Sequence, residues 1–260
     1  MLDALSPQRR RLVLGAGSLA LLLIMTVAVI AAVRAGAVSP VPQTGPGPVL
    51  LVSGYGGNVD SLQPLAAALR SAGRAVVVVE PVGDGTGDLR QQAAHLAEVA
   101  ERVRDDAGAP SVDVVGYSAG GVVARLWARD EGGAGVARRV LTLGSPHHGT
   151  SQAALSAEFA GGCPAACEQL VPDSDLLRRL NAGDETPAGP LWATVRSTSD
   201  QVVTPVDSAA LSGALNIVVQ EVCPGSNAAH SDLPRNPVVV AALSSVLGVA
   251  EPQVPSDVAC

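Results

Sequence analysis

The residues Gly-Tyr-Ser-Ala-Gly at positions 116–120 follow a short apolar run and precede a stretch with helical character. A serine on such a sharp turn leaves no room for side chains two positions away on either side, and glycines stand at both positions. The turn presents the Ser118 hydroxyl at the end of a strand, where it can attack a carbonyl carbon. The backbone amide of Ala119 can bind the oxyanion that then forms. An ordinary serine in a glycine-rich turn is the alternative, but the strand–turn–helix context favours the nucleophile.

A serine nucleophile needs a base, and the sequence offers four histidines. His230 follows the last predicted strand and precedes the last predicted helix, in a polar loop, so we predict that it is the base. The acid that orients the imidazole should end a strand between Ser118 and His230. Asp200 meets this condition, and Asp207, seven residues later, is the competing candidate. The other histidines are His95, in a predicted helix, and His147 and His148, after a predicted strand near the site.

A second oxyanion donor is expected from the loop after the first strand. That loop is Ser53–Asn58, and its small residues allow the backbone to approach a reacting carbonyl. The predicted donor is the backbone amide of Tyr55. A plain glycine turn is the alternative interpretation of this loop.

Alternating strands and helices must position these residues. Apolar runs predict buried strands at 49–52, 75–79, 112–115, 140–143, 191–196 and 217–222. Helical spacing, caps and turns predict helices at 60–69, 88–106, 119–128 and 238–247. The fold class is therefore α/β, with a mostly parallel sheet of about six strands and helices on both faces. Residues 149–190 interrupt the alternation and are expected to form loops or a small lid.

Together these motifs resemble a known family, the α/β-hydrolase lipases and esterases, above all the small bacterial class 2 (triacylglycerol) lipases. The resemblance covers nearly all of residues 48–248, and the segments that carry it are Leu51–Gly57, Val114–Gly121, Leu143–Thr150, Ser199–Pro205 and His230.

The resemblance implies the α/β-hydrolase fold and a catalytic triad, in the chain order Ser118, Asp200, His230. It also implies that the amides of Tyr55 and Ala119 form the oxyanion hole. The chain departs from the family at Ser53 and Tyr117, where members often have histidine, and these departures concern substrate fit more than catalysis.

The charge balance excludes one class of partner. All 17 basic residues are arginine, and residues 35–260 contain 13 arginines against 23 acidic residues. Because phosphate contacts need a basic face, a domain this acidic is a poor nucleic-acid binder.

The first 47 residues form a segment that differs in composition from the rest of the chain. Residues 1–11 are basic, and the uncharged residues Leu12–Val33 are long enough to span the roughly 30 Å hydrocarbon layer as a helix. We predict a transmembrane signal-anchor, with residues 34–47 as a Pro/Gly-rich linker and the body of the chain outside the cytoplasm. A signal peptide cleaved near Ala37 and a buried core helix are the alternatives.

The exported body comprises a catalytic domain at 48–250 and a tail at 251–260. Its four cysteines indicate two disulfides, and closeness in sequence favours Cys163–Cys167 and Cys223–Cys260. Free or metal-binding thiols are the alternative, although no CxxC pair is present.

The sequence thus predicts an exported serine hydrolase that cleaves carboxylic esters, of lipids or acylglycerols, through an acyl-enzyme and without metal or organic cofactor. An exported acyltransferase would use the same triad and pass the acyl group to a sugar or lipid. A catalytically silent envelope binding protein is the third hypothesis.

Overall fold

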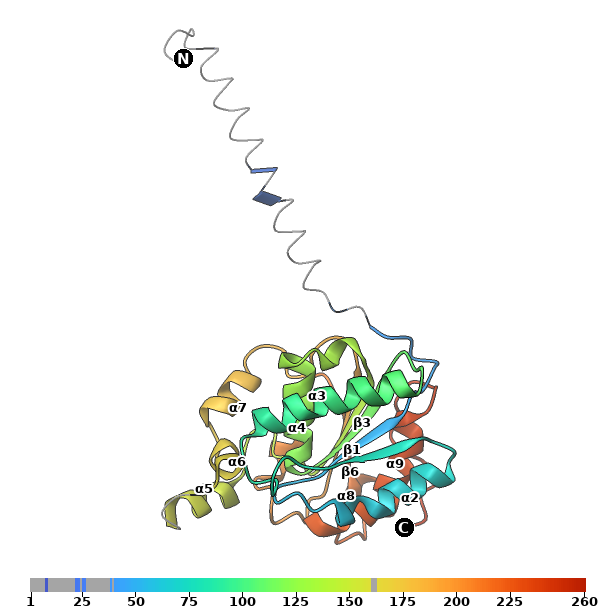
Figure 1. Cartoon of the computed structure of the whole chain (residues 1–260). Coiled ribbons are helices and arrows are strands. Elements are labelled where there is room, and N and C mark those ends of the chain that lie inside the picture. Colours follow the sequence, from blue (N-terminus) through green and yellow to red (C-terminus); the bar gives the residue numbers. More distant parts are fainter. Residues whose placement is uncertain (1–7, 9–21, 24, 27–37, 39, 160–162) are drawn as a thin grey trace. The chain divides into compact units, whose positions relative to one another are not determined.

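The computed structural model of the 260-residue chain describes residues 8, 22–23, 25–26, 38, 40–159 and 163–260. The chain divides into two units, Met1–Ser39 and Pro40–Cys260, and the second holds the folded domain (Figure 1). Most of the predicted span Leu12–Val33 lies outside the described residues. No helix within the described residues is both long and apolar enough to cross a membrane. The anchor therefore stays a prediction.

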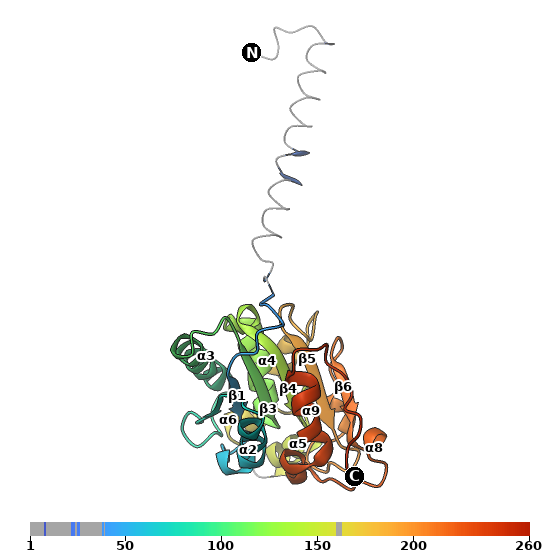
Figure 2. The ribbon, with the colours of Figure 1, turned by 90° about the vertical axis from the view of Figure 1, so that its right-hand side faces the viewer.

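One parallel sheet of six strands organises the described part of the domain. The strands are β1 (Val49–Val52), β2 (Val76–Val79), β3 (Val112–Tyr117), β4 (Ala137–Leu143), β5 (Leu191–Arg196) and β6 (Leu215–Val218), in the order β2-β1-β3-β4-β5-β6. Figure 2 shows β1, β3, β4, β5 and β6 side by side in this order. β1 and β3 lie inside the sheet, so the loops that follow them meet at its carboxyl edge.

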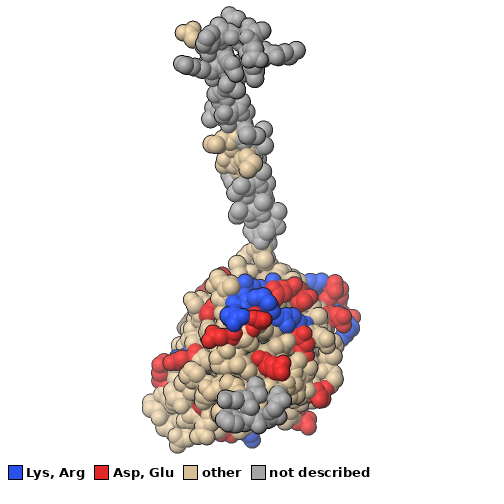
Figure 3. Space-filling view, turned by 90° about the vertical axis from the view of Figure 1, so that its left-hand side faces the viewer, with Lys and Arg blue, Asp and Glu red and all other residues tan. Residues whose placement is uncertain are grey.

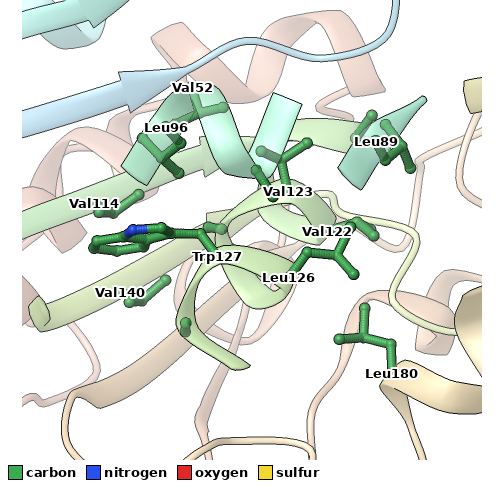
Figure 4. Close-up of a cluster of buried hydrophobic side chains, with 14 of the residues drawn as sticks. Val52, Leu89, Leu96, Val114, Val122, Val123, Leu126, Trp127, Val140 and Leu180 are labelled. Atoms are coloured by element: carbon green, nitrogen blue, oxygen red, sulfur yellow. The ribbon is translucent and has the colours of Figure 1, made fainter. Parts of the chain in front are cut away.

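Helices cover both faces because successive strand residues point to opposite sides. Leu50 and Val52 pack with α3 (Leu89–Asp106) and α4 (Ala119–Asp130). Val49 and Leu51 pack with α2 (Gln63–Ser71) and α9 (Pro237–Leu247) on the other face. In the first cluster the indole of Trp127 lies beside Val114 and Val140 of the sheet (Figure 4). The predicted arrangement of helices on both faces is confirmed.

Shorter elements connect this scaffold. They are the 3-10 turns η2 (Val59–Leu62), η3 (Gly133–Gly135), η4 (Val206–Ala209) and η5 (His230–Arg235), and the helices α5 (Ser151–Phe159), α6 (Ala165–Gln169), α7 (Asp175–Leu180) and α8 (Val219–Val222). The segment that interrupts the predicted alternation, 149–190, contains the helices α5, α6 and α7 within its described residues, 149–159 and 163–190. Within it, Thr150 bonds to the carbonyl of Leu170, which joins α6 to the start of α5.

The last predicted strand was too long. It was expected at 217–222, but β6 ends at Val218, and Val219–Val222 form α8. The neighbouring strand explains the difference, because β5 ends at Arg196, which pairs with Val218. Residues beyond Val218 have no hydrogen-bond partner on β5. Without such a partner, even an apolar segment does not continue as a strand.

A buried charge cluster holds the amino ends of the strands to the last helix. Asp113 of β3 is fully buried, and its Oδ2 accepts hydrogen bonds from Arg74 and Arg138, at 2.6 and 2.5 Å. Arg138 also donates to the carbonyl oxygens of Leu247 and Gly248 at the end of α9. The arginines thus satisfy orphan carbonyls of a helix end, and this polar network lies at the edge of the sheet opposite to Ser118.

Both predicted disulfides, Cys163–Cys167 and Cys223–Cys260, are present. The second ties the tail to the end of α8, rather than to the end of a strand as its sequence position suggested. On the face drawn in Figure 3, arginines gather in one group flanked by acidic side chains.

Candidate active site

Ser118 lies on the sharp turn between the end of β3 and the start of α4. Its φ of 54° and ψ of −126° place a non-glycine residue in a strained region of the backbone map. Such strain persists only where the surrounding structure enforces it. Its presence at this serine agrees with the predicted nucleophile turn.

Two glycines make room for that turn. A Cβ on Gly116 would lie 2.6 Å from the backbone of Gly121, and one on Gly120 would lie 2.3 Å from the carbonyl oxygen of Val52. Neither contact is sterically possible, so β3 and β1 approach the start of α4 closely only because these side chains are absent. The prediction that Gly116 and Gly120 fill crowded positions is confirmed.

The structure brings Ser118, His230 and Asp200 together in one hydrogen-bonded series. The Nε2 atom of His230 lies 3.0 Å from Oγ of Ser118, and its Nδ1 lies 2.7 Å from Oδ2 of Asp200. The other carboxylate oxygen, Oδ1 of Asp200, accepts from the amides of Val202 and Val203, at 2.8 and 2.9 Å. The carboxylate is thereby fixed in orientation, and the imidazole is held between the acid and the serine.

Asp207, the competing acid, lies elsewhere. Its side chain is 81% exposed and pairs with Arg196 at 3.2 Å, whereas the side chain of Asp200 is 3% exposed. Burial and backbone hydrogen bonds favour Asp200 over Asp207 as the acid beside His230, a choice that sequence position alone leaves open.

Tyr117 holds the imidazole from a second side. Its hydroxyl donates to the carbonyl oxygen of His230 at 3.1 Å, and the two ring centroids are 5.1 Å apart. Burial, followed by the nearby charge of Asp200, raises the pKa of Tyr117 to about 12, so the hydroxyl keeps its proton at neutral pH. Sequence reasoning noted Tyr117 only as a departure from the resembled family and missed this contact.

The remaining histidines have other partners. His95 is half-buried on α3 beside Glu98, and Nε2 of His148 lies 2.7 Å from Glu185. His147 is fully buried and shares a hydrogen bond with Thr142, and burial, followed by the charge of Arg125, holds its pKa well below the usual range. These contacts leave His230 as the histidine that bonds to Ser118.

The loop after β1 approaches the nucleophile. A Cβ on Gly54 would lie 2.8 Å from Cβ of Ser118, so the backbone just before Tyr55 is in close contact with the turn. Ala119 is the first residue of α4, where amides have no partner within the helix. Of the two predicted oxyanion residues, Ala119 follows Ser118 in the chain, and Tyr55 follows Gly54, whose backbone lies against Ser118.

Two cavities meet at Ser118. One of about 570 Å³ has a mixed lining, in which Asp60, His230 and Arg235 stand beside apolar residues such as Pro64 and Val202. The other, of about 230 Å³, is lined mostly by apolar groups, including Leu170 and the Cys163–Cys167 disulfide. Among the described residues, no group of three or more His, Cys, Asp or Glu side chains is placed to hold a metal ion.

Comparisons with known proteins support an assignment of the fold. Residues 47–160 match the family model described as "alpha/beta hydrolase fold". No curated protein matches the chain at a significant level.

Solved structures agree with the family model. Lipase B of Aspergillus fumigatus is 21% identical with a TM-score of 0.69, over 79% of this chain and 53% of that one. The propeptide form of Bacillus licheniformis lipase BlEst2 is 19% identical with a TM-score of 0.66, over 85% of this chain and 54% of that one. The mature form of the same lipase is 19% identical with a TM-score of 0.56, over 69% and 85%. The chain spans about half the length of the first two proteins. From the sheet, the turn at Ser118 and these comparisons, we conclude that the chain has the α/β hydrolase fold.

Proposed function

We propose that the chain is a serine hydrolase that cleaves carboxylic esters. The observation that carries the proposal is the series of hydrogen bonds from Ser118 through His230 to Asp200, on a strained strand-to-helix turn. Solved lipases of the same fold support it. Lipid or acylglycerol esters are the substrate class that the resemblance suggests.

In the proposed reaction, Oγ of Ser118 attacks the ester carbonyl carbon while Nε2 of His230 takes its proton. The amides of Tyr55 and Ala119 stabilise the oxyanion. His230 then returns the proton to the leaving alcohol, and the acyl group stays on Ser118. Water, deprotonated by His230, attacks the acyl-enzyme. The bond between the acyl carbon and Oγ breaks, His230 returns the proton to Oγ of Ser118, and the acid product leaves.

The test combines a covalent probe with a substrate series. We expect a fluorophosphonate probe to label the wild-type chain, and p-nitrophenyl esters of increasing acyl length to be hydrolysed. The Ser118→Ala variant should not be labelled, and its kcat should be several orders of magnitude below that of the wild type, because the substitution removes the nucleophile.

Ser244→Ala is the matched control, since Ser244 is exposed on α9 and should keep both activities. Retention of more than a few per cent of kcat in pure Ser118→Ala would overturn the assignment. An acyltransferase would instead be recognised by a transesterified product when a sugar or lipid alcohol is added to the assay.

We also propose that this domain works outside the cytoplasm. Disulfides persist in oxidising compartments, and the two pairs present here support export. The basic residues 9–11 ahead of the uncharged segment Leu12–Val33 favour an anchor with the domain on the outer side.

A further inference from the structure

The two cavities at Ser118 differ in chemical character. Leu170, Val203 and Ala153, all buried, line the smaller one. The larger one has a mixed lining with a greater polar share than the smaller one, and we call it the polar cavity. Its polar side chains are those of Asn58, Asp60, Ser61, Tyr117, Ser118, His230, Ser231 and Arg235, and Gly54, Tyr55, Pro64 and Val202 complete the lining. An ester bound at Ser118 therefore has a mostly apolar environment on one side and a more polar one on the other.

His230 determines which half of the ester lies on which side. The imidazole lines the polar cavity and is not among the residues that line the apolar one. In the proposed reaction the protonated imidazole donates to the oxygen of the leaving alcohol, and a general acid must be within hydrogen-bond reach of that oxygen. The alcohol half of the ester must then leave through the polar cavity, and the acyl chain occupies the apolar one.

The charged side chains of the larger cavity indicate which class of leaving alcohol it can bind. Asp60 and Arg235 provide one charge of each sign, and both are exposed to solvent. Ser61 and Ser231 add hydroxyl groups that can both donate and accept. A lining with balanced charge and mixed donors and acceptors suits a neutral group with several hydroxyls better than an anion or a hydrocarbon.

We propose, building on the proposed ester hydrolysis, that the substrate is an ester of an apolar acyl chain with a neutral polyhydroxy alcohol. A triacylglycerol does not fit this description, because its leaving alcohol is an apolar diacylglycerol. A monoacylated sugar and a monoacylglycerol both fit, and they differ only in the source of the polyhydroxy group.

The test compares esters that share one acyl chain and differ in the alcohol. The substrates are 6-O-octanoylglucose, 1-monooctanoylglycerol and ethyl octanoate, each assayed below its aggregation concentration with the full chain. We expect at least one polyhydroxy ester to have a kcat/KM roughly tenfold or more above that of ethyl octanoate, the gain expected from one or two hydrogen bonds to charged groups. Which of the two is preferred identifies the source of the alcohol.

Substitutions in the polar cavity should reduce that preference. Asp60→Leu and Arg235→Leu should each lower the ratio of kcat/KM for the polyhydroxy ester to that for ethyl octanoate by about tenfold. Arg104→Leu is the control, because Arg104 lies on α3, pairs with Asp105 and lines neither cavity. It should keep the wild-type ratio.

The failures are distinguishable. If ethyl octanoate is hydrolysed at least as well as both polyhydroxy esters, or if the ratio in both leucine variants equals that of the wild type, the inference is wrong and the ester hydrolase remains. If no ester is hydrolysed and the fluorophosphonate probe does not label Ser118, the proposed function and the inference both fail.

Discussion

At the scale of residues, Asp200 and Asp207 stand seven positions apart and have opposite surroundings. Asp200 accepts two backbone amides and contacts His230, whereas Asp207 is exposed beside Arg196. We predict that Asp200→Asn lowers kcat by on the order of 10³- to 10⁴-fold, because an amide no longer holds the imidazole in the required tautomer. Asp207→Asn should change kcat less than twofold, since exposed ion pairs contribute little. Steady-state kinetics on one p-nitrophenyl ester check both, and a larger loss in Asp207→Asn would show that the acid is misassigned.

Tyr117 gives a second prediction at this scale. Tyr117→Phe removes the hydroxyl that donates to His230 and keeps the ring. One neutral hydrogen bond contributes about 0.5–1.5 kcal/mol, so we expect kcat to fall about two- to tenfold, with KM for ethyl octanoate little changed. Tyr117→Leu, which also removes the ring that packs on the imidazole, should lower kcat further. A variant that melts earlier but keeps the wild-type kcat would show that the contact serves stability alone.

A residue of the candidate site could be predicted where a serine, aspartate or histidine stands at or after the end of a predicted strand. Ser118, Asp200 and His230 each follow or lie between predicted strands, and the structure brings them into hydrogen-bond contact. The Tyr117 contact could not be predicted in this way. It joins residues 113 positions apart, and no spacing rule states which backbone carbonyl a tyrosine on β3 will meet.

At the scale of elements, the turn after β3 depends on glycine. We predict that Gly116→Ala destabilises the domain by about 1–3 kcal/mol or more, because its Cβ would meet backbone atoms of Gly120 and Gly121 at 2.6 Å. These atoms belong to the start of α4 and cannot rotate away as a side chain can. Thermal or urea unfolding measures the loss, and activity should fall with it, since Ser118 lies on the same turn.

Gly135→Ala is the matched control for that substitution. A Cβ at Gly135 has no heavy atom within 4 Å and the backbone is not left-handed there, so we expect stability unchanged or slightly increased. Equal losses in the two variants would mean that crowding at the turn is not the cause.

The elements show how far periodicity predicts structure. The segments 49–52 and 191–196 are predicted as strands and match β1 and β5 in their observed bounds. The helix predicted from residue 88 is α3, and the side chain of Asp88 caps it by accepting from the amide of Arg90. The end of β6 was not predictable, because it depends on where β5 stops. A strand persists only while its neighbour offers hydrogen bonds, and that information lies outside the segment itself.

At the scale of the whole molecule, the two disulfides close loops of very different length. Cys223 and Cys260 are 37 positions apart, and Cys163 and Cys167 are 4 apart. In the chain-entropy model, we predict that replacing Cys223 and Cys260 with serine costs about 3–4 kcal/mol, and replacing Cys163 and Cys167 about 2 kcal/mol. Denaturant unfolding of the two double variants tests the order. The short pair lines the apolar cavity, so its loss should affect long acyl chains more than short ones, and a reversed order of stability would contradict the entropic explanation.

The amino-terminal segment is expected to attach the domain to a membrane. Leu12–Val33 carries no charge, and its Leu, Ile and Val residues favour insertion, while residues 9–11 hold the amino end in the cytoplasm. We expect the full chain to be recovered in the membrane fraction, with the domain accessible to protease from the outside. A chain that begins at Val41 should be soluble and active, because every predicted catalytic residue lies at Tyr55 or later.

Cleavage near Ala37 is the rival outcome, and it would release the same domain. Amino-terminal sequencing separates the two, because a mature start at Val38 means secretion and an intact start means anchoring. The acidic domain should itself be repelled by anionic headgroups, so the truncated chain should not bind vesicles of anionic lipid at low salt. Strong binding of the truncated chain to such vesicles would show that the domain, rather than the amino-terminal segment, carries the membrane affinity.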